Sequence, residues 1–140
     1  MPKTLLYALI LILACLLYTP IHYTWNRSPS LPTGIYEITD EPLYRGSFVL
    51  MREPLKQLVG IPGDNIRVAA EGTYVNGHLI PNSAVPASSP YPHYPYTTFA
   101  LVEGQYWLLG NNPLSWDSRY VGPFPASLVA SSVKPVWVKK

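Results

Sequence analysis

The sequence predicts a mainly β domain carried on one N-terminal transmembrane helix. Three observations lead to this fold class. The chain has 16 prolines among 140 residues, and charged residues make up 13% of it, against about 25% in an ordinary soluble protein. One long apolar run lies near the start, and no helical period follows residue 25. The remaining segments are short, β-branched or aromatic, and bounded by Gly, Pro or Asn, so one β-rich domain is expected.

The apolar run extends from Leu5 to Tyr18 and is the first predicted element. Crossing about 30 Å of hydrocarbon requires roughly 20 helical residues, and counting on to Trp25 reaches that length. Tyr23 and Trp25 then lie where an interfacial aromatic belt would be. Pro20 is expected to bend or end the helix near the outer interface. We therefore expect a membrane anchor over residues 1–25 and an exported domain over residues 26–140.

The charge before the apolar run predicts its orientation. Lys3 and the amino terminus favour a cytoplasmic N-terminus, which places the domain on the far side of a bacterial plasma membrane, in the periplasm or its equivalent. A cleaved secretory signal and a lipoprotein signal ending at Cys15 are the alternatives. No Ala-x-Ala site follows the run, and the residues after Cys15 stay apolar, so a retained single-pass anchor is favoured. All three readings place the domain outside the cytoplasm.

Seven segments of the exported part have the composition of strands. They are Gly34 to Thr39, Gly46 to Arg52, Lys56 to Val59, Asn65 to Ala69, Tyr74 to Ile80, Gln105 to Leu109 and Leu128 to Val138. Within the fifth, Asn76-Gly77 is typical of a type I′ hairpin turn, which needs two positive φ angles.

The interval from Pro81 to Tyr96 is expected to be a surface loop. It contains five prolines, and proline is excluded from central strands because it has no N–H to donate.

Charge and cysteine usage exclude several kinds of function. The net charge is +2, and the basic residues are scattered apart from the closing Lys139-Lys140, so no patch suits a nucleic acid. Cys15 is the single cysteine, which excludes an intrachain disulfide and a cysteine metal site. We expect no metal and no cofactor.

Three stretches contain residue types that could carry chemistry. Residues 26–34 follow the anchor and contain Ser28-Pro29-Ser30-Leu31-Pro32. Residues 56–64 begin with Lys56, which opens an apolar strand that leads into Gly-Ile-Pro-Gly-Asp. Residues 110–123 form a turn-rich segment. Taken alone, the first stretch is typical of a linker and the second of a solvated charge at a sheet edge. The third alone is typical of a loop tied by an ion pair.

Together and in this order, the three stretches resemble the Ser/Lys signal peptidases of the bacterial plasma membrane. The resemblance runs from the anchor to about Pro125 and is weak between residues 70 and 100. It implies a small signal-peptidase-like β-barrel or sheet domain. It also implies that Ser30 is the nucleophile and Lys56 the general base. The backbone N–H of Ser30 and the hydroxyl of Ser28 would be the oxyanion donors.

The third stretch corresponds to the family element Ser-x-Asp-Ser-Arg-Tyr-x-Gly-Pro. The resemblance implies that Ser115 and Asp117 lie near the lysine, that Ser115 orients its amine, and that Asp117 is a functional residue. General leader peptidases carry Asp-Asn-Arg where this chain has Asn111-Asn112-Pro113, so any ion pair must come from Asp117 and Arg119. They also have one more residue between nucleophile and proline. This shorter spacing in the present chain favours the conjugative-transfer, pilin-processing branch (TraF type).

The chemistry explains why a serine and a lysine are needed. A serine hydroxyl attacks well only when a neighbouring base removes its proton, and a lysine amine can do so only when it is neutral. The lysine pKa must fall from about 10.4 towards 7 or 8, which burial can achieve. Leu55, Leu58 and Val59 beside Lys56 are compatible with such burial. No histidine is required.

The expected function is that of a membrane-anchored serine endopeptidase that cuts signal or leader peptides from exported precursors. The favoured precursor is a conjugative pilin or another transfer-apparatus protein. The alternatives are a general type I leader peptidase and a non-catalytic anchored β-domain subunit of a secretion or conjugation machine. A cytoplasmic self-cleaving repressor is disfavoured because the chain has an anchor and no recognisable Ala-Gly cleavage linker.

Overall fold

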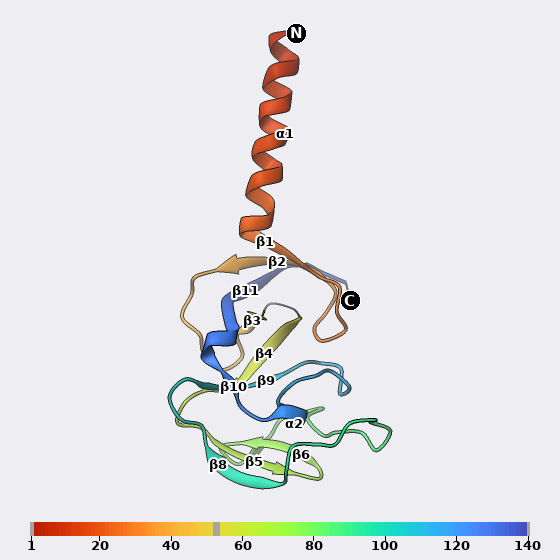
Figure 1. The fold of residues 1–140 in the computed structure, drawn as a ribbon, viewed down its shortest axis with the longest axis vertical. Helices are drawn as coiled ribbons and strands as arrows, with labels where there is room; N and C mark the ends of the chain where they lie inside the picture. Colours follow the sequence, from red (N-terminus) through yellow and green to blue (C-terminus); the bar gives the residue numbers. More distant parts are fainter. Residues whose placement is uncertain (1, 52–53, 140) are drawn as a thin grey trace.

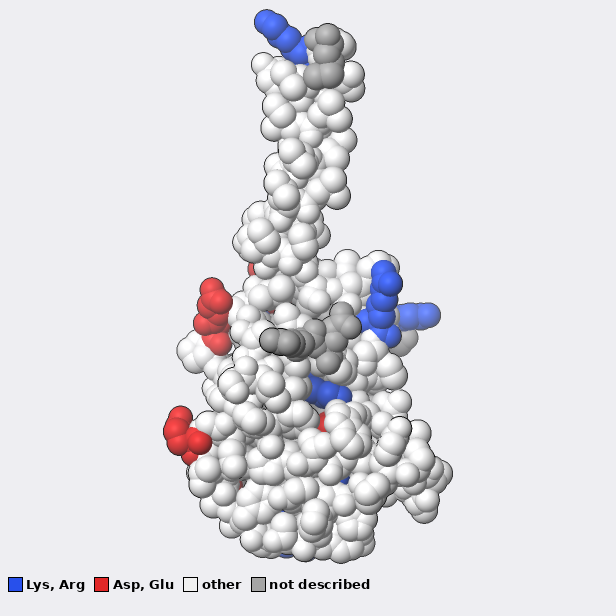
Figure 2. Space-filling view, viewed as in Figure 1, with Lys and Arg blue, Asp and Glu red and all other residues white. Residues whose placement is uncertain are grey.

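The chain forms one long N-terminal helix that projects from a β domain (Figure 1). In the computed structural model, which describes residues 2–51 and 54–139, helix α1 spans Lys3–His22 and buries none of its residues. Among the described residues it is the one helix long and apolar enough to cross a membrane. Figure 2 shows its surface free of charged side chains except near the N-terminal end. Pro20 lies inside α1, which ends two residues later at His22 rather than at the proline.

A seven-stranded sheet lies next to the helix and forms the larger part of the domain (Figure 1). Its spatial order is β1-β2-β11-β3-β4-β9-β10. The strands are β1 Tyr23–Asn26, β2 Gly34–Thr39, β3 Phe48–Met51, β4 Leu55–Gly60, β9 Gln105–Leu109, β10 Phe124–Pro125 and β11 Val129–Val138. The C-terminal strand β11 pairs with both β2 and β3, so the last residues of the domain hold its first strands together.

A smaller four-stranded sheet lies at the end of the domain away from α1 (Figure 1). Its order is β7-β6-β5-β8, with β5 Asn65–Ala69, β6 Gly72–Val75, β7 His78–Leu79 and β8 Thr97–Ala100. Asn76 and Gly77 join β6 to β7 with φ angles of 51° and 82°. These are the two positive values of the predicted type I′ turn, which is therefore confirmed.

The mainly β fold class is confirmed, with differences in individual elements. Strands β2, β5 and β9 have the predicted bounds. The predicted strand from Gly46 to Arg52 is shorter, because β3 spans Phe48–Met51 and Arg52 lies outside the described residues. Three further strands, β1, β8 and β10, and two short helices, α2 Ser118–Val121 and the 3-10 turn Ala126–Leu128, were not predicted.

Strand β1 changes the interpretation of residues 23–25, which were counted with the membrane segment. These residues pair with β2, with Trp25 opposite Ile35. Length and hydropathy could not separate the two states, because Tyr, Thr and Trp suit both an interfacial position and a strand. Helix α1 thus passes directly into the sheet.

Two apolar clusters position the candidate site. The first fills the space between the sheets, with Trp107 and Ile66 fully buried at its centre. The second contains Leu31, Tyr36, Leu55 and Val133. It fixes Leu31, the residue after Ser30, and Leu55, the residue before Lys56, in one core. The predicted loop over residues 81–96 is confirmed, since these residues form neither helix nor strand.

Candidate active site

Ser30 lies in a tight turn that follows β1, and its side chain is buried. The turn is organised by Asn26, the last residue of β1, which is itself buried. The Asn26 amide nitrogen donates to the carbonyls of Ser28 at 3.0 Å, Leu31 at 2.9 Å and Pro32 at 3.2 Å. Its oxygen accepts the N–H of Ser28 at 3.1 Å. One side chain thus fixes the backbone on both sides of Ser30.

The amine of Lys56 meets two hydroxyls from distant parts of the chain. Lys56 lies on β4 and is only 1% exposed. Its Nζ donates to Ser115 Oγ at 2.6 Å and to Ser30 Oγ at 3.3 Å. The two hydroxyl oxygens are 2.6 Å apart. Ser30, Lys56 and Ser115 therefore form a closed triangle within hydrogen-bond reach.

Burial changes the protonation of this lysine. Removal from water lowers the pKa of Lys56 from 10.5 to about 8. Asp117 opposes this shift by attracting the ammonium, and Arg119 adds to it by repulsion. A substantial fraction of the amine is then neutral near pH 8, as a general base requires.

Asp117 and Arg119 form a buried ion pair behind the triangle, with Arg119 Nη2 and Asp117 Oδ2 3.2 Å apart. Asp117 also accepts the backbone N–H of Gly110 at 2.8 Å and of Arg119 at 3.1 Å. Arg119 donates in turn to the carbonyls of Gly110 and Asn112. Among the described residues no hydrogen bond joins Asp117 to Lys56. Asp117 thus influences the amine through its charge and by holding the loop.

Gly110 allows the loop after β9 to approach the turn that carries Ser30. A Cβ at this position would lie 2.7 Å from Ser115 Oγ and 3.1 Å from the carbonyl oxygen of Ser30. The next residue, Asn111, donates its N–H to that same carbonyl. A larger residue at position 110 would separate Ser30 from Ser115.

The two predicted oxyanion donors are engaged with each other in this structure. The Ser30 N–H donates to Ser28 Oγ at 3.1 Å, and the Ser28 hydroxyl donates to Ser30 Oγ at 2.8 Å. Rotation about the Ser28 side chain would redirect its hydroxyl. Binding of a substrate carbonyl at Ser30 therefore has to replace these contacts.

The structure brings all six predicted site residues into one connected region. Ser28, Ser30, Lys56 and Ser115 share direct hydrogen bonds, and the loop that carries Ser115 also carries the Asp117–Arg119 pair. Sequence reasoning missed Asn26 and Gly110. Asn26 ends a strand and precedes a Pro-containing turn, which is a signal for a side chain that bonds to the backbone. The catalytic roles of the six predicted site residues stay predictions.

A cleft of ≈560 Å³ opens beside Ser28. It lies between the chain from Pro20 to Ser28 on one side and Leu50, Pro54 and Leu55 on the other. Leu55 immediately precedes Lys56 along β4. The cleft could therefore hold a polypeptide next to the turn that carries Ser30.

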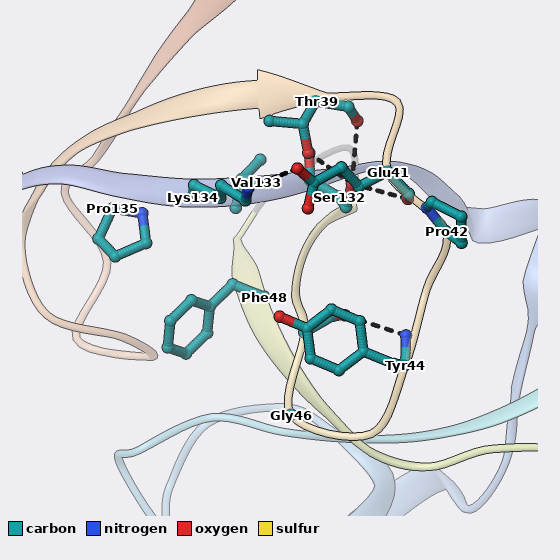
Figure 3. Close-up of a pocket in the computed structure, with 11 residues that line it drawn as sticks. Thr39, Glu41, Pro42, Tyr44, Gly46, Phe48, Ser132, Val133, Lys134 and Pro135 are labelled. Carbon is teal, nitrogen blue, oxygen red and sulfur yellow. Dashed lines mark hydrogen bonds and ion pairs between the residues drawn. The ribbon is translucent and has the colours of Figure 1, made fainter.

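A second cavity, of ≈120 Å³, lies between β2, β3 and β11 (Figure 3). Ser132 donates to the carbonyls of Thr39 and Glu41 there, at 3.0 and 3.1 Å, and Tyr44 donates its backbone N–H to Ser47. None of the six predicted site residues lines this cavity. Its polar groups serve the packing of β11 against β2.

Comparison with known proteins finds a family model, curated proteins and a solved structure to which this chain is similar. The family model described as signal peptidase, peptidase S26, matches residues 2–138. Two curated proteins named plasmid transfer protein TraF, both from Escherichia coli, are 25% and 26% identical over 142 aligned positions, which cover 79% of this chain and 80% of each relative. A probable signal peptidase I-2 from Synechocystis sp. is 36% identical over 72 residues, 51% of this chain and 32% of that protein. A solved signal peptidase I from Enterococcus faecalis is 22% identical with a TM-score of 0.48, over 69% of this chain and all of the other.

Proposed function

Because the chain belongs to the signal peptidase family, peptidase S26, we propose that it is a membrane-anchored serine endopeptidase with a Ser30–Lys56 dyad. Its substrates are exported precursors that carry a signal or leader peptide. The observation that carries the proposal is the buried triangle of Ser30, Lys56 and Ser115, in which a lysine with a lowered pKa contacts the serine hydroxyl.

The reaction begins with attack of Ser30 Oγ on the scissile carbonyl carbon. The Ser30 proton passes to the neutral Lys56 amine, directly or through the Ser115 hydroxyl, which contacts both groups at 2.6 Å. The negative oxygen that forms is stabilised by the Ser30 N–H and the Ser28 hydroxyl. The Lys56 ammonium then gives its proton to the departing amine. Water attacks the acyl-enzyme, again with Lys56 as base, and restores Ser30.

The location of the reaction follows from helix α1. An apolar helix of 20 residues anchors the domain, and Lys3 before it favours a cytoplasmic N-terminus. The domain then lies on the outer face of a bacterial plasma membrane. Strand β1 continues directly from the helix, which supports an active site close to the membrane surface.

The names of the relatives support one class of precursor as the substrate. Two of them are named plasmid transfer proteins and match about four fifths of their length. This similarity supports a conjugative pilin precursor or another transfer-apparatus protein as substrate. A general type I leader peptidase is the second candidate, favoured by the probable signal peptidase of which 32% is matched.

Replacement of the nucleophile tests the proposal. The purified full chain in detergent micelles should cut a precursor whose apolar segment ends in Ala-x-Ala. Ser30→Ala should abolish cutting, because it removes only the attacking oxygen, while retaining the fold. Ser127→Ala is the matched control, since Ser127 is exposed and lies outside the site. Cleavage by Ser30→Ala at the normal rate would contradict the serine mechanism, and a wild-type chain that binds the precursor without cutting it would support a non-catalytic subunit.

A further inference from the structure

The proline-rich loop of residues 81–96 is tied to the loop that carries Ser115, here called the 110–122 loop. Tyr94 donates its backbone N–H to the carbonyl of Arg119 at 2.7 Å. The Tyr94 ring lies against Gly122, where an added Cβ would be 2.3 Å from a ring carbon. The same ring packs edge-on against the buried Trp107, with centroids 5.8 Å apart. Tyr94 therefore connects the end of helix α2 to the core between the sheets.

Aromatic side chains form a second contact between the two loops. Tyr91 lies edge-on to Trp116, with centroids 5.6 Å apart, and edge-on to Tyr120 at 6.4 Å. Trp116 and Tyr120 are stacked at 5.7 Å with an angle of 11° between their rings. The Tyr120 hydroxyl also donates to the carbonyl of Pro113 at 2.7 Å. Trp116 lies in the sequence between Ser115 and Asp117, so this stack constrains both.

A third contact lies beside the buried ion pair. His93 and Tyr96 of the proline-rich loop line a small cavity together with Arg119. Its volume of ≈20 Å³ holds about one water molecule. The proline-rich loop thus leaves little room for solvent next to Arg119 and its partner Asp117.

We propose that the proline-rich loop is a positioning device for the peptidase reaction: Tyr94, together with the Tyr91–Trp116–Tyr120 stack, holds the 110–122 loop so that Ser115 meets Ser30 and Lys56. Tyr94, Tyr91 and Trp116 are positioning residues, because in the described part of the chain none of them is hydrogen-bonded to Ser30 or Lys56. The five prolines suit this role, since each restricts the backbone before the loop docks. The inference rests on the proposed peptidase function.

The proposal has a specific kinetic consequence. Displacing the 110–122 loop would remove Ser115 from Lys56 and admit water to the amine, whose charged neighbours are Asp117 and Arg119. The rate constant of the chemical step would fall, since misplacement by about 1 Å costs up to about 100-fold. Substrate binding would stay unchanged, because no residue of the proline-rich loop lines the ≈560 Å³ cleft.

The test compares Tyr94→Ala with Tyr94→Phe in the full chain, with the Ala-x-Ala precursor peptide as substrate. The Tyr94 hydroxyl takes part in no hydrogen bond among the described residues, so Tyr94→Phe should match the wild type. Tyr94→Ala should lower kcat about 10- to 100-fold with KM unchanged. Wild-type kcat should rise with pH through about 8, where Lys56 loses its proton. In Tyr94→Ala this rise should move to higher pH, because a hydrated lysine has a higher pKa.

The control experiments separate positioning from loss of fold. A lower kcat with an unshifted pH profile, an increase in KM, or equal losses in Tyr94→Ala and Tyr94→Phe would each overturn the inference. If Tyr94→Ala does not fold, variants of the exposed residue Trp116 provide the test. Trp116→Ala should then have a lower kcat, while Trp116→Phe should keep most of the wild-type kcat. A wild-type chain whose cleavage does not depend on Ser30 would refute the proposed function instead. Ser30-dependent cleavage with unchanged kinetics in both alanine variants would refute the positioning role alone.

Discussion

The lysine at the centre of the site is kept at a cost to folding. Lys56 is almost fully buried, and its pKa falls from 10.5 in water to about 8 in the folded chain. Between these two values the unfolded chain binds more protons, so the free energy of unfolding rises with pH there. Below pH 8 the penalty for burying the ammonium is present in full. Above about pH 10.5 both states hold a neutral amine and the penalty is gone.

Replacing this amine should therefore stabilise the fold while it removes activity. We expect Lys56→Met to raise the free energy of unfolding by about 1–3 kcal/mol at pH 7, and by little near pH 10.5. Urea unfolding of the two proteins at both pH values measures the difference. Lys134→Met is the control, because Lys134 is half exposed and its replacement should leave the free energy of unfolding nearly unchanged. A destabilised Lys56→Met would mean that the hydrogen bonds of the amine outweigh its desolvation.

At the scale of elements, strand β1 links helix α1 to the turn that carries Ser30. Its last residue, Asn26, makes four hydrogen bonds to the turn that presents Ser30. Leu31, the residue directly after Ser30, packs in the core and is only 2% exposed. Strand pairing to β2 on one side and the buried leucine on the other leave the turn little freedom.

Loss of the Asn26 side chain should loosen this turn. Asn26→Ala leaves the Leu31 carbonyl without a side-chain donor and should cost about 1–3 kcal/mol of stability. Precursor cutting should fall by about 10- to 100-fold in protein that is still folded. Asn65→Ala is the matched control, because Asn65 is exposed at the start of β5. Equal activities in the two variants, measured at a temperature where both are folded, would show that Asn26 does not position Ser30.

The elements also show what the sequence could and could not predict. Strands β2, β5 and β9 alternate or run apolar between clear breakers, so local chemistry defines their ends. Strand β1 follows the apolar run closely, Pro20 lies inside the helix and does not mark its end, and four residues are too few to show a period. The contact between Ser30 and Ser115 spans 85 residues, which local patterns do not encode, so it could be predicted only from the family resemblance. The support from Asn26 and Gly110 depends on backbone positions that exist only in the fold.

At the scale of the whole molecule, the helix and the site are close along the chain. Helix α1 ends at His22 and β1 runs from Tyr23 to Asn26, immediately before the turn that carries Ser30. An extended chain spans at most about 3.6 Å per residue, so Ser30 lies within roughly 30 Å of the helix end. Strand β1 also lies against β2 directly below the helix (Figure 1). In the proposed reaction, the scissile bond of a substrate would therefore lie close to the membrane.

This geometry predicts where a precursor is cut. An extended substrate with Ala-x-Ala after an apolar segment should be cut behind the second Ala, because small side chains let the backbone approach Ser30. Mass spectrometry of the new amino terminus determines the position. Moving the Ala-x-Ala sequence about 30 residues away from the apolar segment should strongly reduce cutting in membranes. Cutting of the displaced site at the same rate, or after a bulky charged residue, would show that the substrate class is wrong.

The order of the site residues along the chain has a consequence for biosynthesis. The proposed nucleophile, Ser30, is made early, the proposed base, Lys56, 26 residues later, and Ser115 85 residues after Ser30. A nascent chain that has exposed only its first strands carries an ordinary, unreactive serine. Under the proposed mechanism, activity requires that the last third of the polypeptide has been synthesised and that β11 has paired between β2 and β3. Incomplete chains left by aborted translation should therefore lack peptidase activity.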